Sequence, residues 1–582
     1  MTDLLLPILV FLPIVMAIVV LLLPRRSYGM YKGLTIGATT VQLLISLMLL
    51  GIYHTDIGAE AAGVVNEANF QLITKTDWIT LSLGEFGKLK ADFFLGLDGV
   101  SLPMVVLTAI VMMIGAISSF EIKDKQRGFY ALYLLLAGTI MGCFVALDMF
   151  LFYLFFEFML LPMYFLIGLW GGKRSEYAAI KFFIYTLFGS ILILIVMIGL
   201  SVSVMDPAAT AIELGLANAG ELVPTTVVEQ VQQMLAAGQI SSEYIVRTFN
   251  VLRMMEAENY IPDSLLNIDA SYMLFGTKVR FVAFLMVLIG FGIKLPVVPV
   301  HTWLPDAHVE APTSISVVLA GILLKVGGYG MLRMAYGIFP DGGYHFAWWI
   351  GLFGVISIIY GAFVALGTHN LKRLIAYSSV SHMGFVALGI ASQTGEGVTG
   401  AIYQMFSHGI ISSLLFLLAG VLYYRTKNLE INDYSGLYKK MPRYTILATI
   451  GFFASLGLPG FSGFIAEVII FLGAFSSNAV NGLLPRWMPI VSTLGLILSA
   501  AYYLWALQRM FLGKFQVRVE EDESKLIDLS TREMLMMVPL AITTFVFGVY
   551  PQFLIDMMSA SVEVFIDFTN EMGPLYLGTL LK

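Results

Sequence analysis

The sequence predicts an all-α polytopic membrane protein of about fourteen transmembrane helices, arranged as two inverted five-helix repeats that each contain a broken helix. Three observations support this prediction. Of the 582 residues, 58% are hydrophobic and only 12% are charged, with a mean hydropathy of +0.85, whereas a soluble protein is about half apolar and a quarter charged. Apolar runs of about 20 residues, long enough to cross a bilayer, recur along the chain. Two of these runs are interrupted by proline and glycine.

The charge and the single cysteine exclude several kinds of function. A net charge of −6 gives no indication of a nucleic-acid partner. One cysteine, Cys143, is too few for a disulfide framework or for a cysteine-bound zinc or iron–sulfur site. It lies in an apolar run, where a free cysteine packs as a small hydrophobic residue. The stretch 4–23 lacks the basic segment of a cleavable signal, so we expect it to be the first span.

Fourteen segments meet the length and hydropathy test for a membrane span. They are 4–23, 31–52, 102–119, 129–147, 149–170, 178–204, 280–300, 312–335, 346–366, 372–391, 398–424, 443–475, 489–512 and 535–553. The stretch 443–475 is too long for one straight helix and contains LPGFSG, so we expect a break there. We expect 280–300 to break at LPVVP for the same reason.

The two broken helices suggest an internal repeat. Interrupted helices in corresponding positions of two halves are typical of inverted-repeat transporters. We expect the five-helix unit 129–335 to recur as 346–512, and because five is odd the second copy starts from the opposite side. The mapping depends on the order of spans and breaks, since residue identity between the halves is weak. The flanking parts are an N-terminal three-helix segment, 1–128, and a last helix with an acidic tail, 535–582.

Basic residues in alternate loops predict the orientation in the membrane. These loops are 24–26 with Lys32, 123–127, 171–174, 369–373, 425–443 and 509–532. The connections 54–101 and 205–278 are acidic or neutral. We therefore expect the basic loops in the cytoplasm and both termini on the outer side of a bacterial inner membrane.

The two long outer connections are expected to carry some structure of their own. The 54–101 connection alternates enough for a short hairpin. The acidic insertion 205–278 is expected to hold a helix begun by a capping box, Thr226-x-x-Glu229, and a second helix at 242–259. Surface elaboration and contact with a partner are both open roles for this insertion.

Ionisable side chains lie inside the predicted spans, where each costs about 2.5–3.5 kcal/mol on insertion scales. The candidates are Glu157, Lys294, Lys325, His408 and Glu467, with His382 as a weaker sixth, in the repeat position of Glu157. Each has a structural alternative. A protonated glutamate can bond a backbone carbonyl, a lysine can reach the interface, and a lone histidine can be structural or a relay. Acid, base and imidazole groups that recur near mid-depth on separate spans favour a proton relay.

Glu157 and Lys294 are the candidates for a switching pair. At about 4 Å and an effective dielectric near 20 their attraction is about 4 kcal/mol, and at about 10 Å it is about 1.7 kcal/mol. Moving one carboxylate can therefore decide whether a buried lysine keeps its proton.

The segment HTWLPDAHVEAPTS (301–314) follows the first break and also carries titratable groups. The spacing of His301, Asp306, His308 and Glu310 fits no zinc motif, so we expect no metal. His301 is a weaker candidate for a group that takes up protons.

Three stretches resemble a known family. They are KLPVVPVHTWLPDAHVEAPTSISVVLAGILLKVGGYG (294–330), HNLKRLIAYSSVSHMGF (369–385) and LGLPGFSGFIAE (456–467). Together they resemble the antiporter-like subunits of respiratory complex I and of the multi-subunit sodium/proton antiporters. The resemblance extends from the third span onward and is compatible with the first two spans. The length of the insertion 205–278 departs from the family pattern.

The resemblance implies a fold and a set of roles. It implies fourteen helices in two inverted five-helix units, with Glu157 and Lys294 as the pair that controls protonation. It assigns Lys325 and His408 to the central axis and Glu467 to the exit-side relay. Two features favour one member of the family, a subunit of complex I that lies between the proximal and the distal antiporter-like subunits. These features are a glutamate at 467, where several members have lysine, and a short acidic tail at 556–582.

The resemblance also implies partners and cofactors outside this chain. The sequence has no flavin fingerprint, cysteine ligand set or quinone site, so flavin, iron–sulfur clusters and quinone are expected at other subunits. The expected partners are the distal and proximal antiporter-like subunits, the lateral helix of the distal one across this chain's flank, and membrane lipid.

Three functions follow from these observations. The first is a proton-translocating subunit of NADH:quinone oxidoreductase, which is coupled to electron transfer elsewhere. The second is a subunit of a multi-subunit sodium/proton antiporter, which an ion gradient drives. The third, a non-transporting scaffold, requires the buried charges to be inert.

Overall fold

The structure is a computed structural model that describes residues 4–55, 65–218, 220–518 and 526–581. Parts of the expected outer connection 54–101, of the insertion and of the basic loop 509–532 lie outside the described residues.

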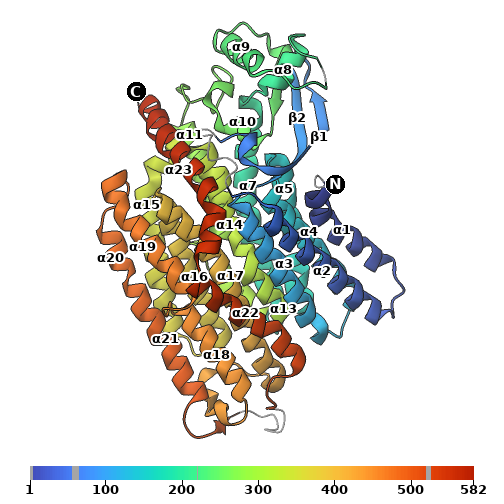
Figure 1. The fold of residues 1–582 in the computed structure, drawn as a ribbon, viewed down its shortest axis with the longest axis vertical. Coiled ribbons are helices and arrows are strands. Elements are labelled where there is room, and N and C mark those ends of the chain that lie inside the picture. Colours follow the sequence, from blue (N-terminus) through green and yellow to red (C-terminus); the bar gives the residue numbers. More distant parts are fainter. Residues whose placement is uncertain (1–3, 56–64, 219, 519–525, 582) are drawn as a thin grey trace.

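Long helices that run side by side form most of the molecule (Figure 1). The helices of the bundle are α1 Leu5–Leu22, α2 Tyr28–Ile52, α3 Ser101–Ser118, α4 Gln126–Val145, α5 Met149–Phe158, α6 Leu160–Trp170, α7 Ser175–Ser203, α11 Val279–Lys294, α12 Trp303–Glu310, α13 Thr313–Val318, α14 Leu324–Gly330, α15 Pro340–Gly367, α16 Leu371–Ala391, α17 Gly395–Thr426, α18 Pro442–Ser455, α19 Ser462–Val480, α20 Trp487–Ser492, α21 Leu494–Phe511 and α22 Thr531–Val549.

The helices confirm an all-α polytopic membrane protein. Thirteen helical segments in the described part of the chain are long and apolar enough to cross a membrane. The remaining expected span is α11, which has 16 residues because the chain breaks after Lys294. The segments α13–α14, α16 and α17 are buried along almost their whole length, so they form the centre of the bundle.

Two interruptions occur where proline and glycine predict them. Helix α11 ends at Lys294 and α12 begins at Trp303, with Pro296 and Pro299 between them. Helix α18 ends at Ser455 and α19 begins at Ser462. Between these two helices Gly457 has a φ of +78°, which glycine adopts without the steric cost of a side chain. The broken helix is the fourth of five in each half, in the order α4, α5–α6, α7, α11–α12, α13–α14 and then α15, α16, α17, α18–α19, α20–α21.

A small mixed layer covers one end of the bundle (Figure 1). The 54–101 connection forms an antiparallel hairpin of β1, Gln71–Ser82, and β2, Lys88–Leu97. The insertion adds β3, Val246–Thr248, parallel to β2. It also contains α8 Pro207–Glu213, α9 Thr225–Ala236, α10 Val251–Met255, β4 Met273–Leu274 and β5 Thr277–Lys278. A short pair, β6 Tyr434–Ser435 and β7 Gln516–Val517, joins two loops elsewhere in the chain.

Two details of the insertion differ from the sequence prediction. The capping box at Thr226 is wrong, because α9 begins after Pro224 and has no side-chain cap. The single helix expected at 242–259 is also wrong. Its residues instead form β3, which pairs with β2, and the short α10, which Asn250 caps through a bond from Leu252 N–H.

The acidic tail after residue 555 is helical and forms most of α23, Gln552–Leu580, which the sequence prediction did not include. Its buried residues recur every three or four positions, as in Met558, Val562, Phe565 and Thr569, and α23 packs against α15 and α17. The test for a span overlooks this helix because it looks for continuous apolar runs, whereas an amphipathic helix alternates apolar and charged residues.

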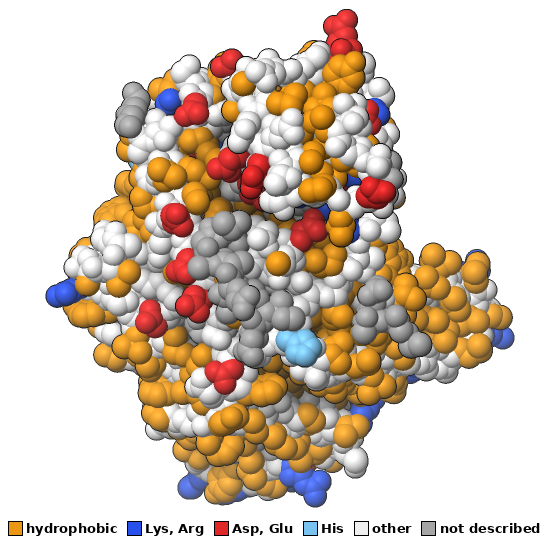
Figure 2. All heavy atoms as spheres, turned by 45° about the horizontal axis from the view of Figure 1, so that its top comes forward, with side chains coloured by type: hydrophobic (Ala, Val, Ile, Leu, Met, Phe, Trp, Pro, Cys, Tyr) orange, Lys and Arg blue, Asp and Glu red, His pale blue; other side chains and the backbone are white. Residues whose placement is uncertain are grey.

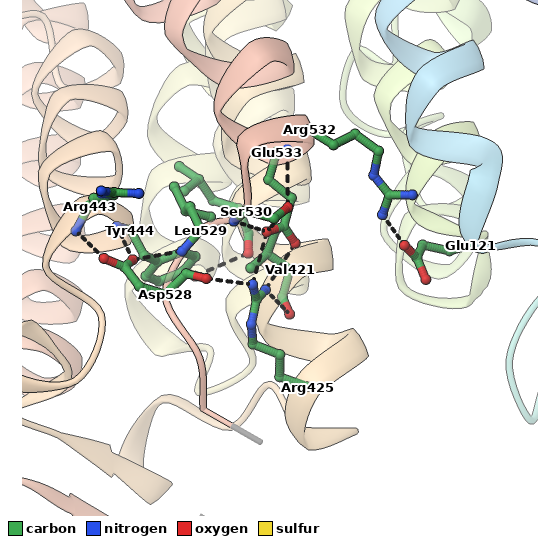
Figure 3. Close-up of polar contacts among 11 residues, drawn as sticks. Glu121, Val421, Arg425, Arg443, Tyr444, Asp528, Leu529, Ser530, Arg532 and Glu533 are labelled. Carbon is green, nitrogen blue, oxygen red and sulfur yellow. Dashed lines mark hydrogen bonds and ion pairs between the residues drawn. The ribbon is translucent and has the colours of Figure 1, made fainter. Parts of the chain in front are cut away.

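At the end of the bundle opposite the hairpin, two acidic residues tie three helices together (Figure 3). Arg425, in the last turn of α17, donates to both carboxylate oxygens of Glu533 on α22, at 3.1 and 2.9 Å. Asp528 accepts from the backbone N–H groups of Arg443 and Tyr444 at 2.9 and 3.0 Å. The N-terminus of α18 has no side-chain cap from its own N-cap residue. Asp528, in the loop that precedes α22, therefore caps it by accepting from its free N–H groups. These contacts hold the ends of α17, α18 and α22 together.

Candidate functional site

Lys325 and His408 are in direct contact at the centre of the bundle. Lys325 follows a π-helical turn, Leu319–Leu323, and its Nζ lies 2.7 Å from His408 Nδ1. The same ammonium donates to the backbone carbonyl of Ala320. Both side chains are buried. Because an ammonium can only donate, Nδ1 accepts whenever the lysine is charged, so the two nitrogens can share one proton.

His382 lies next to this pair and makes three polar contacts of its own. Its ring centroid is 5.4 Å from that of His408. Its Nδ1 faces Gln404 Nε2 at 3.1 Å and Glu467 Oε1 at 3.6 Å, and its Nε2 faces Ser455 Oγ at 3.3 Å. His382 therefore joins the central pair to Glu467.

The second helix break positions the Glu467 carboxylate. A Cβ atom added to Gly457 would lie 2.2 Å from Glu467 Oε2, so the carboxylate occupies space that only glycine leaves open. Beside it, His382, Gln404, His408 and Ser455 line a cavity of about 10 Å³, close to the volume that one water molecule needs.

Lys294 and Glu157, the candidates for a switching pair, are not in direct contact. Lys294 Nζ has no hydrogen-bond partner among the described residues and lies 4.6 Å from the centroid of the Phe156 ring. Lys294 is buried, whereas Glu157 is half-buried and accepts a hydrogen bond of 2.9 Å from Tyr153. The pair is open in this arrangement because the carboxylate points to Tyr153 on its own helix.

His301 lies apart from the central cluster. It is buried, its ring contacts that of Tyr360 at 5.1 Å between centroids, and neither ring nitrogen has a hydrogen-bond partner among the described residues. His308 stacks on Phe416 with 4.4 Å between centroids. The described residues contain no group of three or more His, Cys, Asp or Glu side chains suited to a metal ion.

The sequence analysis missed two members of the cluster, Gln404 and Ser455. Gln404 precedes His408 by four residues on α17 and so lies on the same helix face, a signal that could have identified it. Ser455 is the last residue of α18, and it meets His382 only because α18 and the α16 helix of His382 both pack against α17.

Two buried ion pairs were also missed. Arg280 Nε lies 3.1 Å from Asp341 Oδ1, and the two side chains are 2% and 0% exposed. Arg333 pairs with Asp98, both buried. Each arginine lies in or at the end of a predicted span, and its carboxylate partner lies far away in the sequence. In each pair the arginine charge is neutralised by a carboxylate in contact with it. Lys294 and Lys325 have no such carboxylate in contact among the described residues.

Comparison with known proteins identifies close relatives in sequence. The profile of the family described as NADH:quinone oxidoreductase/Mrp antiporter, transmembrane, matches residues 146–237 and 232–493. NADH-quinone oxidoreductase subunit M of Rhodobacter capsulatus is 36% identical over 580 residues, 99% of each chain. The protein of the same name from Rickettsia prowazekii is 36% identical over 500 residues, 86% of this chain and 87% of its own.

Solved structures agree in fold. A chain of respiratory complex I from Thermus thermophilus with bound NADH has a TM-score of 0.72 at 28% identity, covering 98% of this chain and 100% of that one. A chain of the Mrp complex from a Dietzia species has a TM-score of 0.69 at 18% identity, covering 100% and 99%. The second likeness concerns the fold alone.

Proposed function

The chain belongs to the NADH:quinone oxidoreductase/Mrp antiporter family of membrane subunits, and from this premise we propose that it translocates protons as an antiporter-like subunit of NADH:quinone oxidoreductase. Full-length identity of 36% to a subunit M supports this function. The glutamate at position 467 also favours subunit M, which is the bacterial counterpart of mitochondrial subunit 4. The likeness to the Mrp complex chain, at 18% identity, concerns the fold alone and does not favour the alternative, a subunit of a sodium/proton antiporter.

The observation that carries the proposal is a file of buried titratable groups across the centre of the bundle. Lys325 and His408 exchange a proton across 2.7 Å. His382 receives it beside the small cavity and passes it to Glu467, 3.6 Å away. Each group can both take and release a proton, which a relay requires.

Lys294 and Glu157 act as the control pair in this proposal. The open arrangement leaves the Lys294 ammonium against an aromatic ring. A Glu157 carboxylate that moved to about 4 Å would stabilise the charged lysine by about 4 kcal/mol. Whether Lys294 is charged would then depend on where the Glu157 carboxylate lies. Lys325 would respond to that charge because its helix, α14, packs closely at Gly327 against the end of α11, where Lys294 lies.

The chain contributes no redox centre in this proposal. Electron transfer takes place in other subunits, where flavin, iron–sulfur clusters and quinone are bound. His301 remains a weaker candidate for proton uptake, because it is buried beside the first helix break and its ring nitrogens lack partners among the described residues.

The proposed orientation places the hairpin layer and both termini outside a bacterial inner membrane. The two chain ends lie toward the hairpin side of the bundle (Figure 1). Asp and Glu side chains are spread over that end, whereas most Lys and Arg side chains in view lie at the bottom and at the side edges of the molecule, with a few near the top (Figure 2). This distribution agrees with basic loops on the cytoplasmic side.

The proposed partners are the proximal and distal antiporter-like subunits, with the lateral helix of the distal one on this chain's flank. An apolar groove of about 460 Å³ lies between α11 and α15 at the first helix break, lined by Ile289, Val297, Pro299, Trp349 and Phe353 among others. An apolar helix lying along the bundle would cover this groove, and membrane lipid would cover the remaining flanks.

Lys294→Ala in the intact complex tests the proposal. We expect the complex to assemble, shown by the altered subunit migrating with the NADH-oxidising complex on a native gel, and proton uptake by membrane vesicles to be lost. Glu157→Gln should weaken uptake in the same way. Lys123→Ala, in an exposed loop, is the control. An assembled Lys294→Ala complex with unchanged uptake would support the scaffold function instead.

A further inference from the structure

A chain of hydroxyl groups leads away from His382, and neither the sequence analysis nor the relay above uses it. Ser455 Oγ, 3.3 Å from His382 Nε2, donates to the Tyr503 hydroxyl at 2.8 Å. Tyr503 donates to Ser378 Oγ at 2.9 Å, and Ser378 donates to the Ile375 carbonyl at 2.7 Å. The side chains come from α18, α21 and α16 and are all buried.

The pattern differs from the usual arrangement of buried hydroxyls in this protein. Thr108, Ser381 and Ser413, for example, each donate directly to a backbone carbonyl, which satisfies the hydroxyl and ends the chain. Ser455 and Tyr503 instead donate to another hydroxyl, and within the series only its outermost member, Ser378, donates to a carbonyl. A hydroxyl both donates and accepts, so each group in such a series can accept a proton on one side while it releases one on the other.

The series is also aligned with one tautomer of His382. With the Gln404 amide oriented so that its Nε2 faces Nδ1 at 3.1 Å, the amide nitrogen donates and Nδ1 is the acceptor. Nε2 therefore carries the proton and donates to Ser455. Each group from His382 to Tyr503 thus donates toward Ser378. This is the alignment left behind after a proton has moved from Ser378 to His382, and the hydroxyl groups must rotate before the next proton can follow.

The direction of the series in the bundle suggests where it leads. Ser378 is seven residues from the start of α16 at Leu371, about 10 Å of helix rise, whereas His382 is about 16 Å from it. Tyr503 is eight residues from the end of α21, about 12 Å. Both helix ends adjoin the basic loops, which the proposed orientation places in the cytoplasm.

We propose that Ser378, Tyr503 and Ser455 form a proton-uptake branch that delivers protons from the cytoplasmic side to His382 in the second five-helix unit. The inference rests on the proposed function. A proton reaches Ser378 Oγ, each hydroxyl passes its own proton to the next oxygen, and Ser455 releases one to an unprotonated ring nitrogen of His382. Rotation of the hydroxyls then restores the original alignment, and no bond other than O–H and N–H forms or breaks.

Tyr503→Phe tests the branch because it removes one oxygen and keeps the ring that packs on Phe452. In vesicles that carry the intact complex, we expect proton uptake to slow about tenfold or more. The deficit should grow as the pH on the cytoplasmic side is raised, because uptake then limits the cycle. Tyr444→Phe is the matched control. It is equally buried and loses a 3.0 Å bond to the Leu418 carbonyl, so it should affect stability only.

A second pair of variants keeps the test decisive if Tyr503→Phe fails to assemble. Ser455→Ala should slow uptake as strongly, and Ser455→Thr, which keeps the hydroxyl, should restore it. Normal uptake with an unchanged pH profile in Ser455→Ala or Tyr503→Phe would overturn the branch. Glu467→Gln, measured in parallel, tests the central relay, so a failure of the proposed function would be seen separately.

Discussion

Replacing Lys325 with arginine tests whether this side chain must release its proton. Lys325 Nζ and His408 Nδ1 lie 2.7 Å apart in a buried site. Two positive charges at this separation repel by about 6 kcal/mol at an effective dielectric near 20. Since about 1.4 kcal/mol corresponds to a factor of ten, the doubly charged pair is disfavoured by about four powers of ten. The pair therefore holds one proton, either on the lysine or on the histidine.

Arginine keeps the positive charge but does not release a proton in proteins. Lys325→Arg would therefore hold His408 neutral and block the exchange. We expect NADH-driven proton uptake and the coupled NADH:quinone turnover to fall about a hundredfold, while NADH oxidation by an artificial acceptor stays normal. Proton uptake is measured in inverted membrane vesicles with a pH-sensitive dye.

Lys181→Arg is the control for this substitution. Lys181 pairs with Asp306 at 2.7 Å at the end of the bundle and is 20% exposed, so a permanent charge there is tolerated. If Lys325→Arg pumps at the rate of the unaltered complex, then a fixed charge at this position is sufficient, and the one-proton exchange is wrong.

Three further predictions concern stability and the second helix break. Asp341→Asn leaves Arg280 buried without its counter-charge and should lower the free energy of unfolding by about 3–5 kcal/mol, measured as a lower thermal midpoint. Arg373→Ala, which removes a partly exposed pair with Asp306, should change it by less than about 1 kcal/mol, and equal shifts would contradict the argument. Gly457→Ala should slow proton uptake because its Cβ meets the Glu467 carboxylate, whereas Gly482→Ala, with a similar φ of +72° and open space around it, adds only the backbone strain; equal uptake in both would refute the placement of Glu467. Burial raises the pKa of Asp148, in the outer link before α5, from 3.8 to about 7, so the folded state binds the extra proton and stability should fall as the pH rises from about 4 to about 7. Asp148→Asn should flatten this pH dependence, and an unchanged slope in thermal unfolding would count against it.

Features that depend on local sequence could be predicted. A span requires a long apolar run and a break requires proline or glycine, so the helices and both interruptions follow from short stretches such as LPVVP and LPGFSG. The candidate residues follow from the cost of a charge in a membrane, which makes Lys294, Lys325 and Glu467 conspicuous. The helix α23 was missed because its signal is periodic and its composition is mixed.

Features that depend on contacts between distant segments could not be predicted. Serine, glutamine and tyrosine are common in membrane helices, and nothing near Ser455 or Tyr503 in the sequence indicates that Ser455 lies beside His382 or that Tyr503 bonds Ser455. The sequence proposed Glu157 and Lys294 as a switching pair, but it did not indicate that Glu157 bonds Tyr153 on its own helix in this arrangement. Side-chain direction, which decides that contact, depends on how neighbouring helices pack.

The sequence by itself determined that this chain crosses a membrane many times and places acids, bases and imidazoles within its apolar segments, because hydropathy and the cost of burying charge are properties of short segments. Only the tertiary structure decided which of these groups meet. Lys325, His408, His382 and Glu467 come from four separate segments, and the proposed proton exchange between them depends on distances of a few ångströms that helix packing sets.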